Sequence, residues 1–215
     1  MKKTVRTRNA DATRTAILAS AREAFARAGY DGAGLREIAA GAGVTAMMVH
    51  RYFGSKEQLF AAVIAGIMTT PIILTAENLA SPGLGAALAA GLVQQTRAGA
   101  TPLDGFRIML HSASSPEAAE IGRAQIEQHY QRRLSAALRG ELAPERAALV
   151  LAIVAGVQVM RQMLALPALA DAPSDALIEI LTPIFQRLVD GPRAGRAAAR
   201  SRRRKAAPRS TRIVR

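Results

Sequence analysis

The chain has 215 residues, half of them hydrophobic, and contains no cysteine, which excludes a disulfide framework and a thiolate metal site. Aromatic residues make up only 4%, while alanine and leucine dominate, so the composition favours helix over sheet. The net charge is +13, and its distribution along the chain matters more than its size. The longest apolar run, Ala147 to Val157, is shorter than the ~20 residues of a membrane span, and no apolar segment follows the basic first residues. We therefore expect a cytoplasmic protein with no membrane contact.

The first eight residues carry four basic side chains and no acid, and we expect them to form a disordered basic arm. The arm either lies in a minor groove of DNA or makes no contact. A helix is predicted from Asn9 or Asp11 to Ala28, with Gly29 as its C-cap. Its apolar residues recur at steps of three and four and form one stripe, namely Ile17, Ala21, Ala24, Phe25 and Ala28.

Two short helices follow, one from Leu35 to about Ala42 and one, capped by Thr45, that ends at Phe53. Gly43 breaks the chain between them. Two short helices joined by a tight turn with glycine predict a helix-turn-helix, whose second helix enters the major groove of DNA. The residues expected to face inward are Leu35, Ile38, Ala39, Val44, Val49 and Phe53.

The segment from Ser55 to Gln58 resembles a capping box, in which Ser55 caps a longer helix and Gln58 reaches back to the backbone. Pro71 is expected to end or kink that helix. Further helices are predicted near 84–98, 102–113, 116–139, 144–166 and 174–190, and several of them begin at a proline. The whole pattern predicts an all-α fold.

Residues 191–215 hold ten Arg or Lys and no acid, which leaves residues 9–190 nearly neutral. The tail has no apolar periodicity, so we expect it to be disordered. It serves either to bind phosphate backbones or simply to keep the chain soluble.

Three segments, AFARAGYDG, LREIAAGAGVT and VHRYFGSKEQLF, closely resemble the TetR/AcrR family of bacterial repressors, in a match over about residues 12 to 64. The resemblance implies a three-helix DNA-binding domain at 9–54 and a helical domain for ligand binding and dimerisation at 55–190. It also implies a transcriptional regulator, and because no cysteine and no His/Asp/Glu cluster at metal spacing is present, we expect no cofactor or metal. We expect a repressor that a small apolar or amphipathic ligand releases from a double-stranded DNA operator.

The family pattern implies that Thr45, Tyr52 and Lys56 contact backbone phosphates. A cation in the first turn of a helix opposes the helix macrodipole, so a nearby phosphate explains Lys56 better than helix stability does. The alternative is a solvated surface lysine beside Glu57.

The second short helix departs from the family at its exposed positions, Ala46, Met47, Met48 and His50. Apolar side chains can touch thymine methyls but cannot form paired hydrogen bonds to a base. Arg51 is the residue here that can bind guanine in that way, and His50, which replaces the family's usual tyrosine, is expected to contact a phosphate or a base.

The resemblance implies that helices near 144–166 and 174–190 form a four-helix bundle with a second copy of the chain. The segment RAALVLAIVAGVQVM is apolar on nearly every face and must be buried, which supports a homodimer, with a monomer core as the alternative. Gln158 and Arg161 interrupt this segment and either orient a polar ligand group or bond across the dimer. The candidate ligand-binding residues are Phe106, Met109, Leu110, Gln158, Met160 and Arg161.

The two alternative functions are those of an enzyme and of an architectural DNA binder. The sequence shows neither a glycine-rich phosphate loop nor a catalytic triad, and His50, His111 and His129 fall on separate predicted helices, so we do not expect an enzyme. A non-specific architectural DNA binder driven by the arginine-rich tail would lose binding when residues 192–215 are deleted. A repressor would lose affinity but keep its sequence preference.

Overall fold

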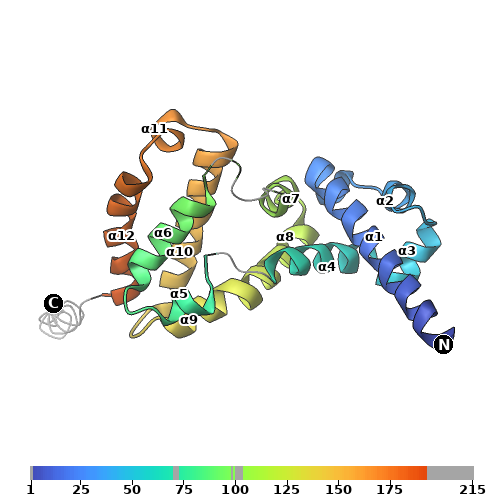
Figure 1. The fold of residues 1–215 in the computed structure, drawn as a ribbon, viewed down its shortest axis with the longest axis horizontal. Coiled ribbons are helices and arrows are strands. Elements are labelled where there is room, and N and C mark those ends of the chain that lie inside the picture. The colour runs from blue at the N-terminus through green and yellow to red at the C-terminus, as the bar shows by residue number, and fades with distance from the viewer. Residues whose placement is uncertain (1, 70–72, 98, 100–103, 193–215) are drawn as a thin grey trace, which may run out of the picture.

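The computed structural model describes residues 2–69, 73–97, 99 and 104–192, and all regular elements in these ranges are helical, as predicted. The predicted arginine-rich tail lies almost wholly outside them. Figure 1 shows an elongated molecule with α1 to α4 at one end and α6, α10, α11 and α12 at the other. The helices are α1 (Lys2–Gly32), α2 (Leu35–Gly41), α3 (Ala46–Phe53), α4 (Lys56–Met68), α5 (Ala76–Ala80), α6 (Leu84–Gln95), α7 (Asp104–Ser112), α8 (Pro116–Ile126), η1 (Glu127–Gln131), α9 (Arg132–Ala137), α10 (Ala143–Gln158), η2 (Val159–Met163), α11 (Pro167–Ala170) and α12 (Ser174–Asp190).

The first helix is longer than the sequence predicted. It begins at Lys2, so residues 2–8, which we expected to be disordered, are helical in the structure. The reason is that the chain holds no glycine or proline between Lys2 and Gly29, while Lys, Arg and Ala are strong helix formers. Gly29, with φ of 67°, interrupts the helix at the predicted position.

The helices beyond residue 80 lie close to their predicted ranges. Residues 116–137 form one continuous helical stretch through α8, η1 and α9, and α10 continues into η2 in the same way. The two η segments are π-helical turns, which often occur at functional positions. The short helices α5 and α11 were not predicted from the sequence.

Two hydrophobic cores hold the molecule together. The first joins α1 to α4, and it includes Ile108 of α7 and Ala118 of α8. The second joins α5, α6, α9, α10 and α12 around Phe185, which is fully buried. Tyr130 packs against both cores. The helices α7 and α8 therefore pack with the N-terminal helices, and Tyr130 of η1 links this part to the second core.

The stretch Ala143–Met163, formed by α10 and η2, is more exposed than is usual for so apolar a helix. It is 21 residues long with a mean hydropathy of 1.5, which is long and apolar enough for a membrane span by length and composition alone. Only 17% of it is buried within the single chain. Since apolar helices are normally buried, this helix presents a face for another surface to cover.

Candidate nucleic-acid interface and adjoining pocket

The helix-turn-helix is formed by α2 and α3. The turn closes at Gly43, with φ of 66°, and the Val44 amide donates to the Ala39 carbonyl at 2.9 Å. Thr45 caps α3 as predicted, and its hydroxyl accepts a hydrogen bond from the Met48 amide at 3.3 Å. The predicted inward face is confirmed: four of its residues are buried, while Leu35 and Val44 pack partly against the same core. The four buried residues are Ile38, Ala39, Val49 and Phe53.

The outer face of α3 presents three of the predicted DNA-contacting residues. The Met47 side chain is 81% exposed, and His50 and Arg51 are exposed as well. His50 donates from Nδ1 to the Gly54 carbonyl at 2.6 Å, which leaves Nε2 for a partner. Within the part of the chain that the structure describes, Arg51 forms no hydrogen bond or ion pair. Its guanidinium is therefore available to bind a base.

The remaining predicted contacts lie around this face. Thr45 is exposed, although its hydroxyl already accepts from Met48. Ala46 and Tyr52 are half-buried and pack against the first core. Their side chains therefore project less from α3 than those of Met47, His50 and Arg51. The sequence reading missed Arg14 of α1, whose guanidinium lies 5.0 Å from the Phe53 ring centroid and adds a cation beside α3.

The start of α4 confirms one half of the predicted capping box. The Ser55 hydroxyl accepts from the Gln58 amide at 3.2 Å, as expected. The reciprocal bond is not formed, because the Ser55 amide donates instead to the Phe53 carbonyl at 3.0 Å. The Gln58 side chain lies over Gly54, where a Cβ would meet its Oε1.

Lys56 has partners inside the protein. Its Nζ lies 4.7 Å from the Tyr30 ring centroid and 3.5 Å from the Asp31 carbonyl oxygen. The neighbouring Glu57 accepts from the Tyr30 hydroxyl at 2.8 Å. Hydrogen bonds from Ser55, from its own backbone amide and from Tyr30 lower the pKa of Glu57 to about 2. Burial, together with the bond to Glu57, raises the pKa of Tyr30 above its ordinary value.

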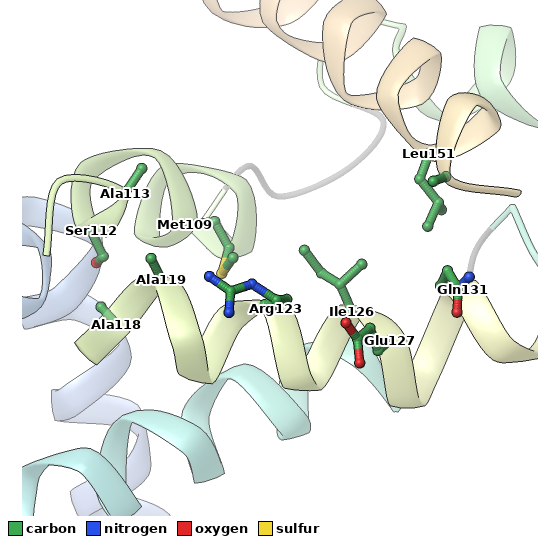
Figure 2. Close-up of a pocket in the computed structure, with 11 residues that line it drawn as sticks. Met109, Ser112, Ala113, Ala118, Ala119, Arg123, Ile126, Glu127, Gln131 and Leu151 are labelled. Atoms are coloured by element: carbon green, nitrogen blue, oxygen red, sulfur yellow. The ribbon is translucent and has the colours of Figure 1, made fainter. Parts of the chain in front are cut away.

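A cavity of about 500 Å³ opens between α7, α8, η1 and α10 (Figure 2). Its lining is mainly apolar, and Figure 2 shows the Arg123 side chain extending toward Met109. Of the six predicted ligand-binding residues, Met109 alone lines this cavity. The lining residues are Met109, Ser112, Ala113, Ala118, Ala119, Arg123, Ile126, Glu127, Gln131, Ala148 and Leu151.

The other five predicted ligand-binding residues are not brought together there. On α7, Phe106 is half-buried and Leu110 is 47% exposed, while on the long helix Gln158 is half-buried and Met160 is 43% exposed. The fifth, Arg161, is buried by contacts that serve the fold.

The Arg161 side chain joins three helices. Its Nη1 donates to the Val93 carbonyl at 2.8 Å and to the Thr96 hydroxyl at 2.9 Å, and its Nε donates to the Leu169 carbonyl at 3.0 Å. Burial, with a smaller effect from Arg97, lowers the pKa of this guanidinium. Arg161 thus ties η2 to the end of α6 and to α11.

In the described ranges, a metal site would need several ligating side chains close together. No group of three or more His, Asp or Glu side chains there is arranged to hold a metal ion. His50, His111 and His129 lie on α3, α7 and η1.

The fold and this interface define a helix-turn-helix DNA-binding protein with a second, helical domain. Two family models match the chain: "Bacterial regulatory proteins, tetR family" over residues 17–63 and "Tetracyclin repressor-like, C-terminal domain" over residues 82–189. The chain belongs to the TetR family of transcriptional regulators. A search of curated proteins finds no match.

Several solved structures share the fold. A TetR-family regulator from Streptomyces coelicolor is 26% identical, with a TM-score of 0.55, and the match covers 84% of this chain and 96% of that one. GusR from Salmonella enterica is 19% identical, with a TM-score of 0.66 and coverage of 83% and 96%. NalD, the secondary repressor of the MexAB-OprM multidrug efflux pump in Pseudomonas aeruginosa, is 24% identical, with a TM-score of 0.57 and coverage of 84% and 98%.

Proposed function

We propose that this chain is a homodimeric repressor that leaves its operator when a small apolar or amphipathic ligand enters the cavity between α7, α8 and α10. The observation that carries the proposal is the exposed outer face of α3, where Arg51 is unpaired within the described ranges and Met47 extends into solvent. NalD is named a repressor, and a similar structure, the multidrug binding protein EbrR, is described in complex with proflavin. Both names support the proposal without identifying the ligand.

In the proposed complex, α3 lies in the major groove with Met47 against a thymine methyl and Arg51 on a guanine. Lys56 binds a backbone phosphate together with Thr45 and Tyr52, and His50 adds a phosphate or base contact through Nε2. Ala46 is small enough to let the helix approach the groove closely. In this proposal the protein acts at the chromosome in the cytoplasm.

The proposed dimer forms through α10 and α12. The exposed apolar side chains there include Leu149, Ile180 and Ile184, which are 53%, 61% and 43% exposed. A shallow apolar groove of about 520 Å³ runs between the two helices. A second copy that packs on this face would cover α10 and hold two helix-turn-helix units for half-sites ~34–36 Å apart.

The proposed ligand site is the cavity itself. Its volume lies within the ~300–1,000 Å³ typical of small-molecule sites. Met109 and the alanines supply an apolar wall, while Arg123 and Gln131 offer polar groups. Such a site suits a molecule with an apolar body and one polar end.

Selection of bound fragments from random DNA tests the function directly. We expect Arg51→Ala to weaken binding to the selected DNA site by about 1–3 kcal/mol and to relax the sequence preference at one base pair. Lys56→Ala should instead weaken all sequences alike and lower the slope of log affinity against log salt by about 1. Arg133→Ala, on the exposed face of α9, is the control. If neither Arg51→Ala nor Lys56→Ala changes binding, the proposal is wrong.

A truncation that removes residues 192–215 separates this function from an architectural DNA binder. The repressor should lose affinity and salt dependence but keep the selected sequence. Loss of all binding would favour the architectural function instead.

A further inference from the structure

Tyr30 connects three parts of the molecule that the function requires. It lies just after the kink at Gly29, and its side chain is 5% exposed. Its ring lies under the Lys56 ammonium, and its hydroxyl donates to Glu57. Its backbone amide donates to the Ser112 hydroxyl at 2.9 Å in a buried hydrogen bond. One residue thus links the start of α4 with the end of α7.

The contacts of Tyr30 leave Lys56 available to a phosphate. The Lys56 ammonium and the Glu57 carboxylate both reach Tyr30 and attract each other electrostatically, but the carboxylate accepts its hydrogen bond from the Tyr30 hydroxyl. No ion pair between Lys56 and Glu57 is found in the described ranges. The ring meanwhile supports the ammonium through a cation–π contact. Tyr30 therefore supports the cation through its ring and engages the neighbouring carboxylate through its hydroxyl, and the two charged groups form no ion pair in the described ranges.

The Tyr30 ring cannot shift alone. Its centroid is 5.1 Å from that of Phe60 in an edge-to-face contact and 6.3 Å from that of Phe25. Phe25 and Phe60 are fully buried and 5.0 Å apart. Close-packed aromatic rings transmit a displacement instead of absorbing it. A movement of the Tyr30 backbone is thus passed to the start of α4.

The other end of the connection is the cavity. Ser112 lines it, and the neighbouring His111 donates from Nδ1 to the Ala26 carbonyl at 3.1 Å. Gly29 approaches the His111 carbonyl so closely that a Cβ there would lie 2.5 Å from the oxygen. These contacts fix the end of α1 against the end of α7. A molecule against Met109 and Ser112 would press on the same turn.

From this geometry we propose that Tyr30 is a positioning residue for the phosphate contact of Lys56, and that Ser112 relays the state of the cavity to it. The proposal rests on the proposed function, because it requires Lys56 to bind DNA. It predicts that DNA affinity changes when the cavity end of the connection is altered, although Ser112 lies on α7 and not in the helix-turn-helix.

Tyr30→Phe tests the first half, because it keeps the ring and removes the hydroxyl. Glu57 is then free to pair with Lys56, so we expect a several-fold loss of operator affinity and a salt slope lower by about 1, as in Lys56→Ala. Tyr30→Phe should cause no further loss in a Lys56→Ala background. The double variant Tyr30→Phe/Glu57→Gln removes the competing carboxylate and should restore both affinity and slope. A purely structural role predicts no such rescue.

Ser112→Ala tests the second half. We expect it to lower affinity and salt slope in the same direction as Tyr30→Phe, because the Tyr30 amide loses its partner. Ser115→Ala is the matched control, since Ser115 is equally buried but bonds to Glu117 and not to α1. Thermal unfolding of each variant confirms that it is folded at the assay temperature.

The outcomes separate this proposal from the proposed function. An affinity loss in Tyr30→Phe with an unchanged slope, or no rescue by Glu57→Gln, overturns the positioning role. Equal binding by Ser112→Ala and wild type overturns the connection to the cavity. If Lys56→Ala leaves DNA affinity unchanged while Arg51→Ala still weakens it, the positioning role is wrong, but the proposed DNA recognition by α3 is not contradicted. If both are silent, the proposed function fails.

Discussion

The guanidinium of Arg146 donates a 2.8 Å hydrogen bond to the carbonyl oxygen of Leu188, and so joins the first turn of α10 to the last turn of α12. The same side chain donates to the carbonyls of Val189, Arg139 and Glu141 at 2.9, 2.6 and 3.0 Å. Carbonyls at a helix C-terminus lack partners in the helix and carry partial negative charge. They stabilise this buried cation without a carboxylate.

Arg146→Met should destabilise the fold by roughly 2–4 kcal/mol, because it removes the donor from several buried carbonyls. Arg146→Lys should recover only part of this loss, since an ammonium lacks the planar fork of a guanidinium. Urea unfolding gives both values. Arg133→Met, at an exposed position on α9, should stay within about 0.5 kcal/mol of wild type. A loss below about 1 kcal/mol for Arg146→Met would contradict this role.

The two buried arginines mark a limit of prediction from the sequence. Caps at Thr45 and Ser55 were predictable because each bonds to an amide three residues away. Arg146 and Arg161 bond to carbonyls 42 and 68 residues away, so their role depends on which helix ends meet in the fold. For this reason Arg161 was predicted as a ligand-binding residue, and the structure places it between helices.

The cavity could not be predicted from the sequence for a related reason. Half-buried alanines such as Ala119 carry no chemical signal, and their exposure to a cavity depends on how α7 and α8 pack against the first core. Exposure on α3 was more predictable, because the helical period and the buried Val49 and Phe53 already orient Met47 and Arg51 outward. Local periodicity thus located the candidate DNA-reading face, while tertiary packing formed the pocket.

Gly29→Ala should destabilise the fold by about 2 kcal/mol or more, because the new Cβ would meet the His111 carbonyl and because φ of 67° disfavours alanine. Thermal unfolding measures the loss. Gly66→Ala is the matched control, since Gly66 lies within α4 with nothing within 4 Å of the added Cβ. That variant should be stabilised by about 0.5–1 kcal/mol. Equal effects of the two substitutions would refute the close approach of α1 to α7.

Ile180→Asp should weaken the proposed dimer. Ile180 lies on the exposed apolar face of α12, and a carboxylate buried there without a partner is costly. We expect the dimer dissociation constant to rise about a hundredfold or more, as measured by sedimentation equilibrium. Ala136→Asp, on the exposed side of α9, should leave it unchanged. A dimer of unaltered affinity in Ile180→Asp would exclude this face as the interface.

Glu57 gives the molecule a defined response to acid. Its pKa is about 2 in the folded state, against an ordinary value of 4.5, so between these pH values the unfolded chain binds more protons than the folded one. The stabilisation by the carboxylate is complete above pH 4.5 and is lost as the pH falls to about 2. The difference in unfolding free energy between wild type and Glu57→Gln should therefore be constant above that range and shrink within it. A difference that grows on acidification would contradict the sign.

Arg123 should select the charge of the ligand. In Figure 2 its guanidinium extends along the cavity toward Met109, and within the described ranges it pairs with no carboxylate. We therefore expect decanoate to bind more tightly than decanol or decyltrimethylammonium, as measured by calorimetry. Arg123→Gln should weaken decanoate roughly three- to tenfold and leave decanol unchanged, because a half-solvated ion pair contributes about 1 kcal/mol. The control, Glu127→Gln, removes the acid of the same cavity and should not weaken decanoate. Equal affinity of wild type and Arg123→Gln for decanoate would show that Arg123 only lines the rim.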